Sequence, residues 1–145
     1  MRQAPWLVVT IIGAFLLCGA ARAEQINFKA DLSGASEVPP VTGPGSGSAT
    51  AALDTTTKTL TWTVTYSGLS DPVAKAGHIH GPAAPGANAG VLVPFNPTAL
   101  ASPIKGSATL TDAQISELEA GQTYVNLHTA AHPSGEVRGQ LVRAQ

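Results

Sequence analysis

The chain has 145 residues with one cysteine, 12% charged residues and a formal net charge of −1 at pH 7. This length suits one domain with a single hydrophobic core. The near-neutral charge leaves neither a basic stripe for nucleic acid nor a polybasic patch for a membrane surface. We therefore predict no nucleic-acid partner.

Residues 1–23 have the pattern of a secretory signal peptide. Arg2 supplies a positive charge, an apolar run extends from Trp6 to Leu17, and a small-x-small cleavage pattern ends at Ala23. The run is shorter than the ~20 residues that a spanning helix needs, and no second candidate follows. The sequence thus predicts an exported protein, periplasmic or secreted, with no transmembrane segment after cleavage. Lipoprotein tethering at Cys18 is the less favoured alternative, because Leu17 before it is not small.

Residues 24–145 form the predicted mature domain, which contains no cysteine. Six basic and nine acidic residues remain in this range, which corresponds to a charge of −3. An exported domain without disulfides must be held together by packing, by hydrogen bonds or by a metal.

Short stretches of alternating apolar and polar residues predict strands along most of this domain. The first two strands after a glycine- and proline-rich loop at 33–48 form a hairpin, with Trp62 as its core anchor. A capping-box pattern at Thr111 and Gln114 predicts one short helix at 112–120, which Gly121 ends. The predicted strands are 26–32, 49–53, 60–66, 74–80, 91–95, 105–110, 124–128 and 136–142. About eight short strands with one short helix predict an all-β fold, an antiparallel Greek-key-like β-sandwich or barrel.

All four histidines fall in two short segments. His78 and His80 end one predicted strand, and His128 ends another, with His132 four residues later. Residues i and i+2 of a strand point to the same face, so His78 and His80 project together. If the two strands meet, three or four neutral imidazoles surround one point, and that ligand set suits Cu or Zn. The alternative is that these histidines only bind loop carbonyls.

Several polar residues near the histidines are candidates for a supporting layer. Asn126 shares a face with His128 and is predicted either to orient it or to satisfy turn backbone. Glu136 and Arg138 also share a face. A surface ion pair is the favoured interpretation, and the alternative is that Glu136 orients a histidine while Arg138 holds it. Glu37 is interpreted as a loop residue.

Five sequence blocks in one order resemble the CHRD family, the domain named from chordin and also found as single exported bacterial domains. The blocks are Leu-Ser-Gly-Ala-Ser-Glu-Val-Pro-Pro at 32–40, Tyr-Ser-Gly-Leu at 66–69, Gly-His-Ile-His-Gly-Pro-Ala at 77–83, Tyr-Val-Asn-Leu-His-Thr at 124–129 and Pro-Ser-Gly-Glu-Val-Arg-Gly-Gln-Leu at 133–141. The resemblance implies a β-sandwich and an extracytoplasmic location. It implies no settled activity.

The His-x-His strand, with further histidines later in an exported β-sandwich, also looks like the copper site of copper-zinc superoxide dismutase. The chain departs from that pattern because it lacks the cysteine pair and the histidine-rich zinc loop. The departure puts dismutase chemistry in doubt, but not copper binding.

Three functions follow as hypotheses. The first is an exported, non-enzymatic binding domain that takes Cu or Zn through His78, His80, His128 and His132. The second is a structural or interaction module, with an extracytoplasmic protein partner and no metal. The third is a copper-dependent redox enzyme similar to superoxide dismutase. No nucleophile elbow and no phosphate-binding loop occurs in the sequence, which argues against a hydrolase or a kinase.

Overall fold

A computed structural model describes residues 24–145, which form one nine-stranded antiparallel sheet. The predicted signal peptide and Cys18 lie outside these residues. The sheet order is β5-β4-β7-β8-β1-β2-β3-β6, and β9 pairs with β1 beside β8. The elements are β1 (Gln25–Ser33), the 3₁₀ turn η1 (Gly34–Ser36), β2 (Ser46–Asp54), β3 (Thr59–Ser67), β4 (Ala76–His80), β5 (Val91–Pro94), β6 (Ile104–Thr109), α1 (Asp112–Glu119), β7 (Tyr124–His128), β8 (Val137–Gln140) and β9 (Val142–Arg143).

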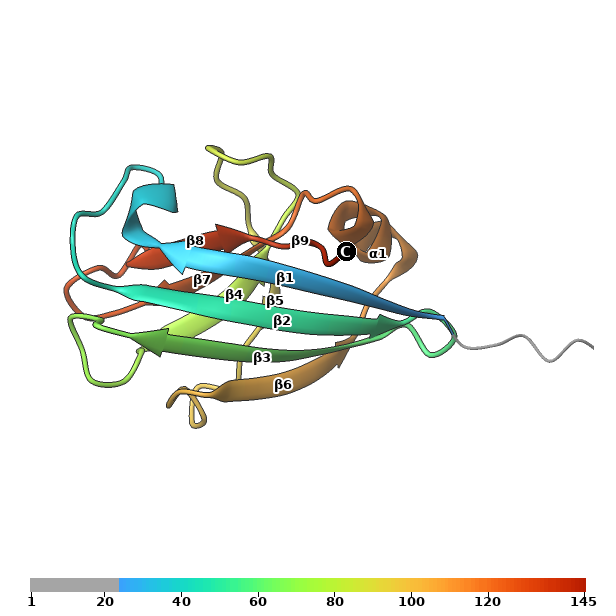
Figure 1. Cartoon of the computed structure of the whole chain (residues 1–145), viewed down its shortest axis with the longest axis horizontal. Helices are drawn as coiled ribbons and strands as arrows, with labels where there is room; N and C mark the ends of the chain where they lie inside the picture. The colour runs from blue at the N-terminus through green and yellow to red at the C-terminus, as the bar shows by residue number, and fades with distance from the viewer. Residues whose placement is uncertain (1–23) are drawn as a thin grey trace, which may run out of the picture.

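The sheet curls on itself into a nearly closed barrel. Strands β1, β2, β3 and β6 form one wall, while β8, β7, β4 and β5 form the wall behind it (Figure 1). Alternate residues of each long strand point between the walls; in β1, for example, Phe28 and Leu32 are buried while Lys29 is exposed. The predicted all-β antiparallel fold with one short helix is confirmed.

The predicted last strand is divided in two. Leu141 is completely buried, and its N–H donates to the carbonyl of Thr123 at 2.9 Å, which extends the pairing of β8 with β7 by one residue beyond Gln140 and Tyr124. The chain then pairs with β1, where Val142 lies opposite Lys29. The division therefore lies where the chain changes its pairing partner from β7 to β1. The capping box at Thr111 and Gln114 is present as predicted.

Trp62 packs across the gap between the two edges of the sheet. Its ring lies over Gly106 of the neighbouring strand β6 and stacks on Phe95, which follows β5, with 5.2 Å between the ring centroids. Because β5 and β6 are the two edge strands, this stack brings the ends of the sheet together. The predicted core anchor thus holds the barrel nearly closed.

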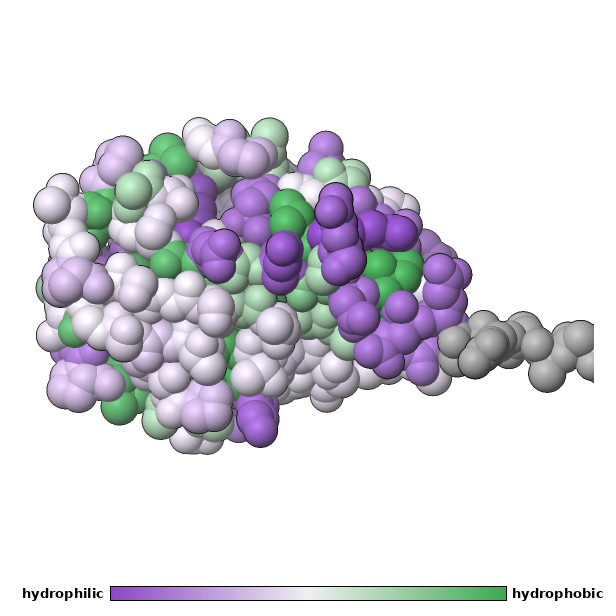
Figure 2. Space-filling model, in the orientation of Figure 1, coloured by the Kyte–Doolittle hydropathy of each residue, from purple (hydrophilic) through white to green (hydrophobic). Residues whose placement is uncertain are grey.

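The outer face of the front wall carries small polar and apolar side chains. Threonines on β2 and β3, such as Thr50 and Thr61, lie beside Ala52 and Lys29 there. In Figure 2 this face has mostly intermediate hydropathy, and its hydrophobic spots are small and scattered. Among residues 24–145 no helix is long and apolar enough to cross a membrane.

The outer face of the back wall is different, because loops cover it. On β4 and β7 the inward residues, such as Ile79 and Leu127, belong to the hydrophobic core. The outward residues are polar, yet Asn126 is only 2% exposed and Arg138 of β8 only 5%. The connections at 34–45, 81–90 and 129–136 supply their partners. The back wall is therefore buried on both faces, and its outer layer is polar.

The packing of Trp62 on Gly106 predicts the cost of adding one methyl group. A Cβ at Gly106 would overlap the indole ring, which the Phe95 stack prevents from moving away. We expect Gly106→Ala to lower the free energy of unfolding by about 1–3 kcal/mol. Urea denaturation measures the change. Gly43→Ala is the matched control because nothing lies within 4 Å of its added Cβ. Equal stabilities of the two variants would contradict the packing argument.

Candidate metal centre

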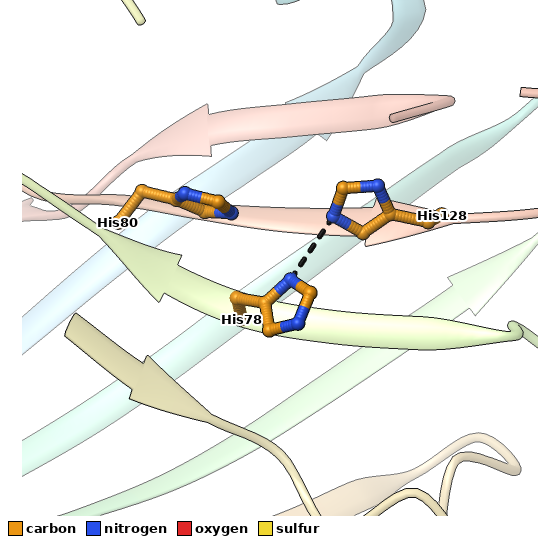
Figure 3. Close-up of side chains that lie close together, drawn as sticks. All are labelled: His78, His80 and His128. Atoms are coloured by element: carbon orange, nitrogen blue, oxygen red, sulfur yellow. Dashed lines mark hydrogen bonds between the residues drawn. The ribbon is translucent and has the colours of Figure 1, made fainter. Parts of the chain in front are cut away.

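Three of the four histidines lie together on the polar outer face of the back wall. His78 and His80 come from β4, and His128 comes from the neighbouring strand β7 (Figure 3). In the antiparallel register His128 lies opposite Ala76, two pairs along the ladder from the pair that His78 makes with Asn126 and therefore on the same face. The two residues between and beside the histidines in β4, Gly77 and Ile79, point into the core. In the His-x-His pattern the two histidines therefore face outward, while the residue between them packs in the core.

Gly77 is required by the close packing beneath this strand. A side chain there would overlap the ring of Phe95 and reach the side chain of Leu127. Glycine lets β4 lie directly on the core, while its neighbours His78 and His80 face outward. The motif's first glycine therefore positions the site through packing.

The three histidines each bring one ring nitrogen to a common region. These nitrogens all lie within 4.8 Å of one another. Nδ1 of His78 is 3.1 Å from Nε2 of His128, and the ring of His80 is 5.2 Å from that of His78, centroid to centroid. Nitrogens bound to one tetrahedral zinc at about 2.0–2.1 Å are about 3.3 Å apart. The nitrogens of His78 and His128 already have about that spacing, and binding would draw the His80 nitrogen closer to them.

Backbone carbonyls determine which nitrogen of two histidines is free. His80 donates from Nδ1 to the carbonyl of Ala89 at 3.0 Å, and His128 donates from Nδ1 to the carbonyl of Pro133 at 3.0 Å. A carbonyl oxygen can only accept, so each Nδ1 carries the proton and each Nε2 keeps its lone pair. Histidines that bind metals typically donate from their other nitrogen in this way.

The Nε2 atom of His80 is buried and has no hydrogen-bond partner among the described residues. The Nε2 atom of His128 accepts a hydrogen bond from Nδ1 of His78. A buried, unpaired acceptor is unfavourable unless another group meets it. A metal ion between the three rings would supply that group.

The cluster disfavours protonation. Burial, with the neighbouring His128 and His80, lowers the pKa of His78 to about 4. Burial also lowers the pKa of His80 and of His128, although their carbonyl partners act in the opposite direction. All three imidazoles are therefore neutral at pH 7, which is the form that binds a metal.

His132 lies in the turn after β7 and is not one of the three gathered histidines. Its backbone closes that turn: its carbonyl accepts from Thr129 at 3.2 Å and from Gly135 at 3.0 Å. Its side chain lines a shallow pocket with Glu37 and Pro133. The structure thus brings together His78, His80 and His128 from the predicted set of four.

The predicted supporting residues are buried, and none of the three forms a hydrogen bond with a histidine side chain in residues 24–145. Asn126 donates to Glu37 and to the carbonyl of Val137, and not to a histidine. Glu136 accepts from the backbone of Ser70 at 2.8 Å and from the hydroxyl of Thr129 at 2.6 Å.

The expected surface pair of Glu136 and Arg138 does not form. Both side chains are buried, and Arg138 instead forms an ion pair with Glu37, with 3.3 Å between Nε and Oε2. Burial raises the pKa of Glu37, while Arg138 and Asn126 oppose that rise. Glu37 lies in a loop, as the sequence predicts, and this loop is one of the three connections that cover the polar layer.

Sequence reasoning also missed Tyr124, which stacks on His80 with 4.9 Å between ring centroids. The sequence could have indicated this contact, because alternate residues of a strand share a face and Tyr124, Asn126 and His128 are spaced by two.

Comparison with known families agrees with the resemblance seen in the sequence. The family model for the CHRD domain matches residues 28–141. The chain belongs to the CHRD domain family. No curated protein and no solved structure matches the chain significantly. The matched range of the CHRD domain includes all three clustered histidines and the Glu37–Arg138 pair.

The lowered pKa values predict that the metal-free CHRD domain loses stability in mild acid. The imidazoles titrate near 6.5 when unfolded and lower when folded, so protonation favours the unfolded state. The contribution of His78 is complete above pH 6.5 and is lost as the pH falls toward about 4, and those of His80 and His128 are lost in the same direction. Thermal unfolding in chelator between pH 8 and 4.5 measures this loss.

The control for this pH series is His78→Gln, which removes the imidazole with the lowest pKa. Its melting temperature should fall less between pH 7 and 5 than that of the unchanged domain. Glu37 contributes with the opposite sign in both proteins because its pKa is raised, so the difference between them isolates His78. Identical slopes would contradict the prediction.

Proposed function

We propose that this CHRD domain is an exported, non-enzymatic metal-binding domain that takes up Cu or Zn through His78, His80 and His128. The observation that carries the proposal is the buried Nε2 of His80, which has no partner in the described residues and faces two other imidazoles. A histidine that only braced a loop would need its Nδ1 bond alone. The free nitrogen supports a ligand in addition to that bond.

The ligand chemistry favours Cu and Zn over the common hard cations. The group consists of imidazole nitrogens only, with no carboxylate oxygen among its members. Ca²⁺ and Mg²⁺ prefer oxygen ligands, whereas imidazole suits Zn and Cu. Among divalent ions of the first transition row, copper binds nitrogen sites most tightly.

Export is the part of the proposal that rests on residues 1–23. Its support is the charged, apolar and small-x-small pattern that ends at Ala23. Cell fractionation and the N-terminal sequence of the purified protein test it. A mature protein that begins at Glu24 and appears outside the cytoplasm is the expected result.

Metal titration tests the binding site directly. We expect purified, metal-free protein to bind one equivalent of Cu or Zn, and His80→Ala to weaken binding by at least about 100-fold, since changes one layer outside a metal site already cost 10–100-fold. Calorimetry or competition with a chromophoric chelator measures the affinity. Absence of uptake by the unchanged protein, or unchanged affinity of His80→Ala, would contradict the proposal.

His132→Ala is the matched control for this titration. It removes the one histidine that lies outside the gathered group, so its affinity should stay within about threefold of that of the unchanged protein. A loss as large as that of His80→Ala would make His132 a fourth ligand, as the sequence alone predicts.

A redox enzyme is the second candidate, because three gathered ligands leave the open coordination position that catalysis needs. A superoxide dismutase assay on copper-loaded protein tests it. Activity no greater than that of free copper would reject this candidate and leave binding. If the protein takes up neither Cu nor Zn, the remaining hypothesis is a structural or interaction module without a metal.

A further inference from the structure

A buried ion pair lies beside the histidines on the outer face of β8. The side chains of Arg138 and Glu37 are only 6% and 3% exposed, and both are held beneath loops. Burying two charges costs several kcal/mol each in lost hydration, so such pairs seldom add stability over apolar residues of the same size. We therefore ask which neighbouring groups this pair holds in position.

Arg138 fastens the connection between β4 and β5 to the sheet. Its guanidinium donates to the carbonyl of Ala87 at 3.0 Å and to the side-chain oxygen of Asn88. Asn88 in turn donates to the carbonyl of Val38, the residue after Glu37, at 3.2 Å. Two loops that are distant in sequence are thus joined through one arginine.

The fastened loop supplies the carbonyl that orients His80. Ala89 follows Asn88, and its carbonyl accepts the Nδ1 proton of His80 at 3.0 Å. Tyr124 holds the same residue, because its hydroxyl lies 3.1 Å from the Ala89 nitrogen and 3.3 Å from the Ala89 carbonyl oxygen. The backbone of the next residue, Gly90, also favours a proton on His80, so the whole loop segment 89–90 orients this ring.

A second route leads from Arg138 to His80 through a stack of flat groups. The guanidinium carbon lies 4.0 Å from the centre of the Tyr124 ring. The His80 ring, from the strand on the other side of β7, also stacks on Tyr124, and the angle between the two ring planes is 4°. The guanidinium therefore restrains the plane of Tyr124, and Tyr124 restrains the plane of His80.

We propose that Arg138, held by Glu37, is a positioning residue that fixes the tautomer and ring plane of His80, so that the Nε2 of His80 faces His78 and His128. The metal-affinity consequence rests on the proposed function. The tautomer of His80 does not, because it is a property of the metal-free domain.

The experiment compares Arg138→Met with Arg143→Met, which removes the same charge from an exposed arginine on β9. Long-range ¹⁵N–¹H spectra of the metal-free protein report the protonated nitrogen of His80. We expect the Nδ1-protonated form in the unchanged protein and in Arg143→Met, and a mixture of tautomers in Arg138→Met. Zn or Cu affinity should fall about 10–100-fold in Arg138→Met and stay unchanged in Arg143→Met.

The tautomer and the affinity separate the two proposals. If the unchanged protein binds no metal but Arg138→Met still alters the His80 tautomer, the metal proposal fails and the positioning role holds. If folded Arg138→Met keeps both the tautomer and the affinity, the positioning role is overturned.

If Arg138→Met does not fold, the variant Asn88→Ala tests the positioning role of Arg138 instead. Asn88 is exposed, and its replacement removes one of the contacts through which Arg138 holds the loop. A partial loss of the Nδ1-protonated form supports the positioning role. An unchanged tautomer together with unchanged metal affinity overturns it.

Discussion

The antiparallel pairing of β4 with β7 is the constraint on which the rest of the candidate centre depends. The register places His128 two pairs along the ladder from His78, and the alternation of each strand sends the histidines to one face and the core residues to the other. A slip of β4 by one residue would turn His78 and His80 toward the hydrophobic core and away from His128. The core contacts of Ile79 and Leu127 oppose that slip, so the same packing that stabilises the barrel also fixes the positions of the three clustered histidines.

The back wall carries a second, polar layer because loops cover its outer face. Each buried polar group there needs a partner, and the partners come mostly from the loops: Ala89 and Pro133 carbonyls for two histidines, and Glu37 for Arg138. Satisfying these groups requires the loops to adopt defined positions. The loops of this face are therefore part of the site.

Strand periodicity explains what could be predicted from the sequence. Alternation is a local property, so the strands, Trp62 in the core and the shared face of His78 and His80 follow from it. Which loop covers which face is a tertiary property. For that reason the pairing of Glu37 with Arg138, which lie near opposite ends of the domain sequence, could not be read from spacing, whereas Glu136 and Arg138 wrongly looked like partners. The position of His132 could not be predicted for the same reason, because it depends on the conformation of the turn after β7.

The hydrogen bond between His78 and His128 bears on how metal binding and folding are related. It satisfies two ring nitrogens when no metal is present, and a net hydrogen bond contributes only about 0.5–1.5 kcal/mol. Structural zinc in small domains, by contrast, contributes on the order of 10–16 kcal/mol to folding. A bound metal would therefore outweigh this bond, and the hydrophobic core of the barrel does not include the three histidines. Under the proposed function, uptake and release of the metal would take place in a domain whose core is already packed.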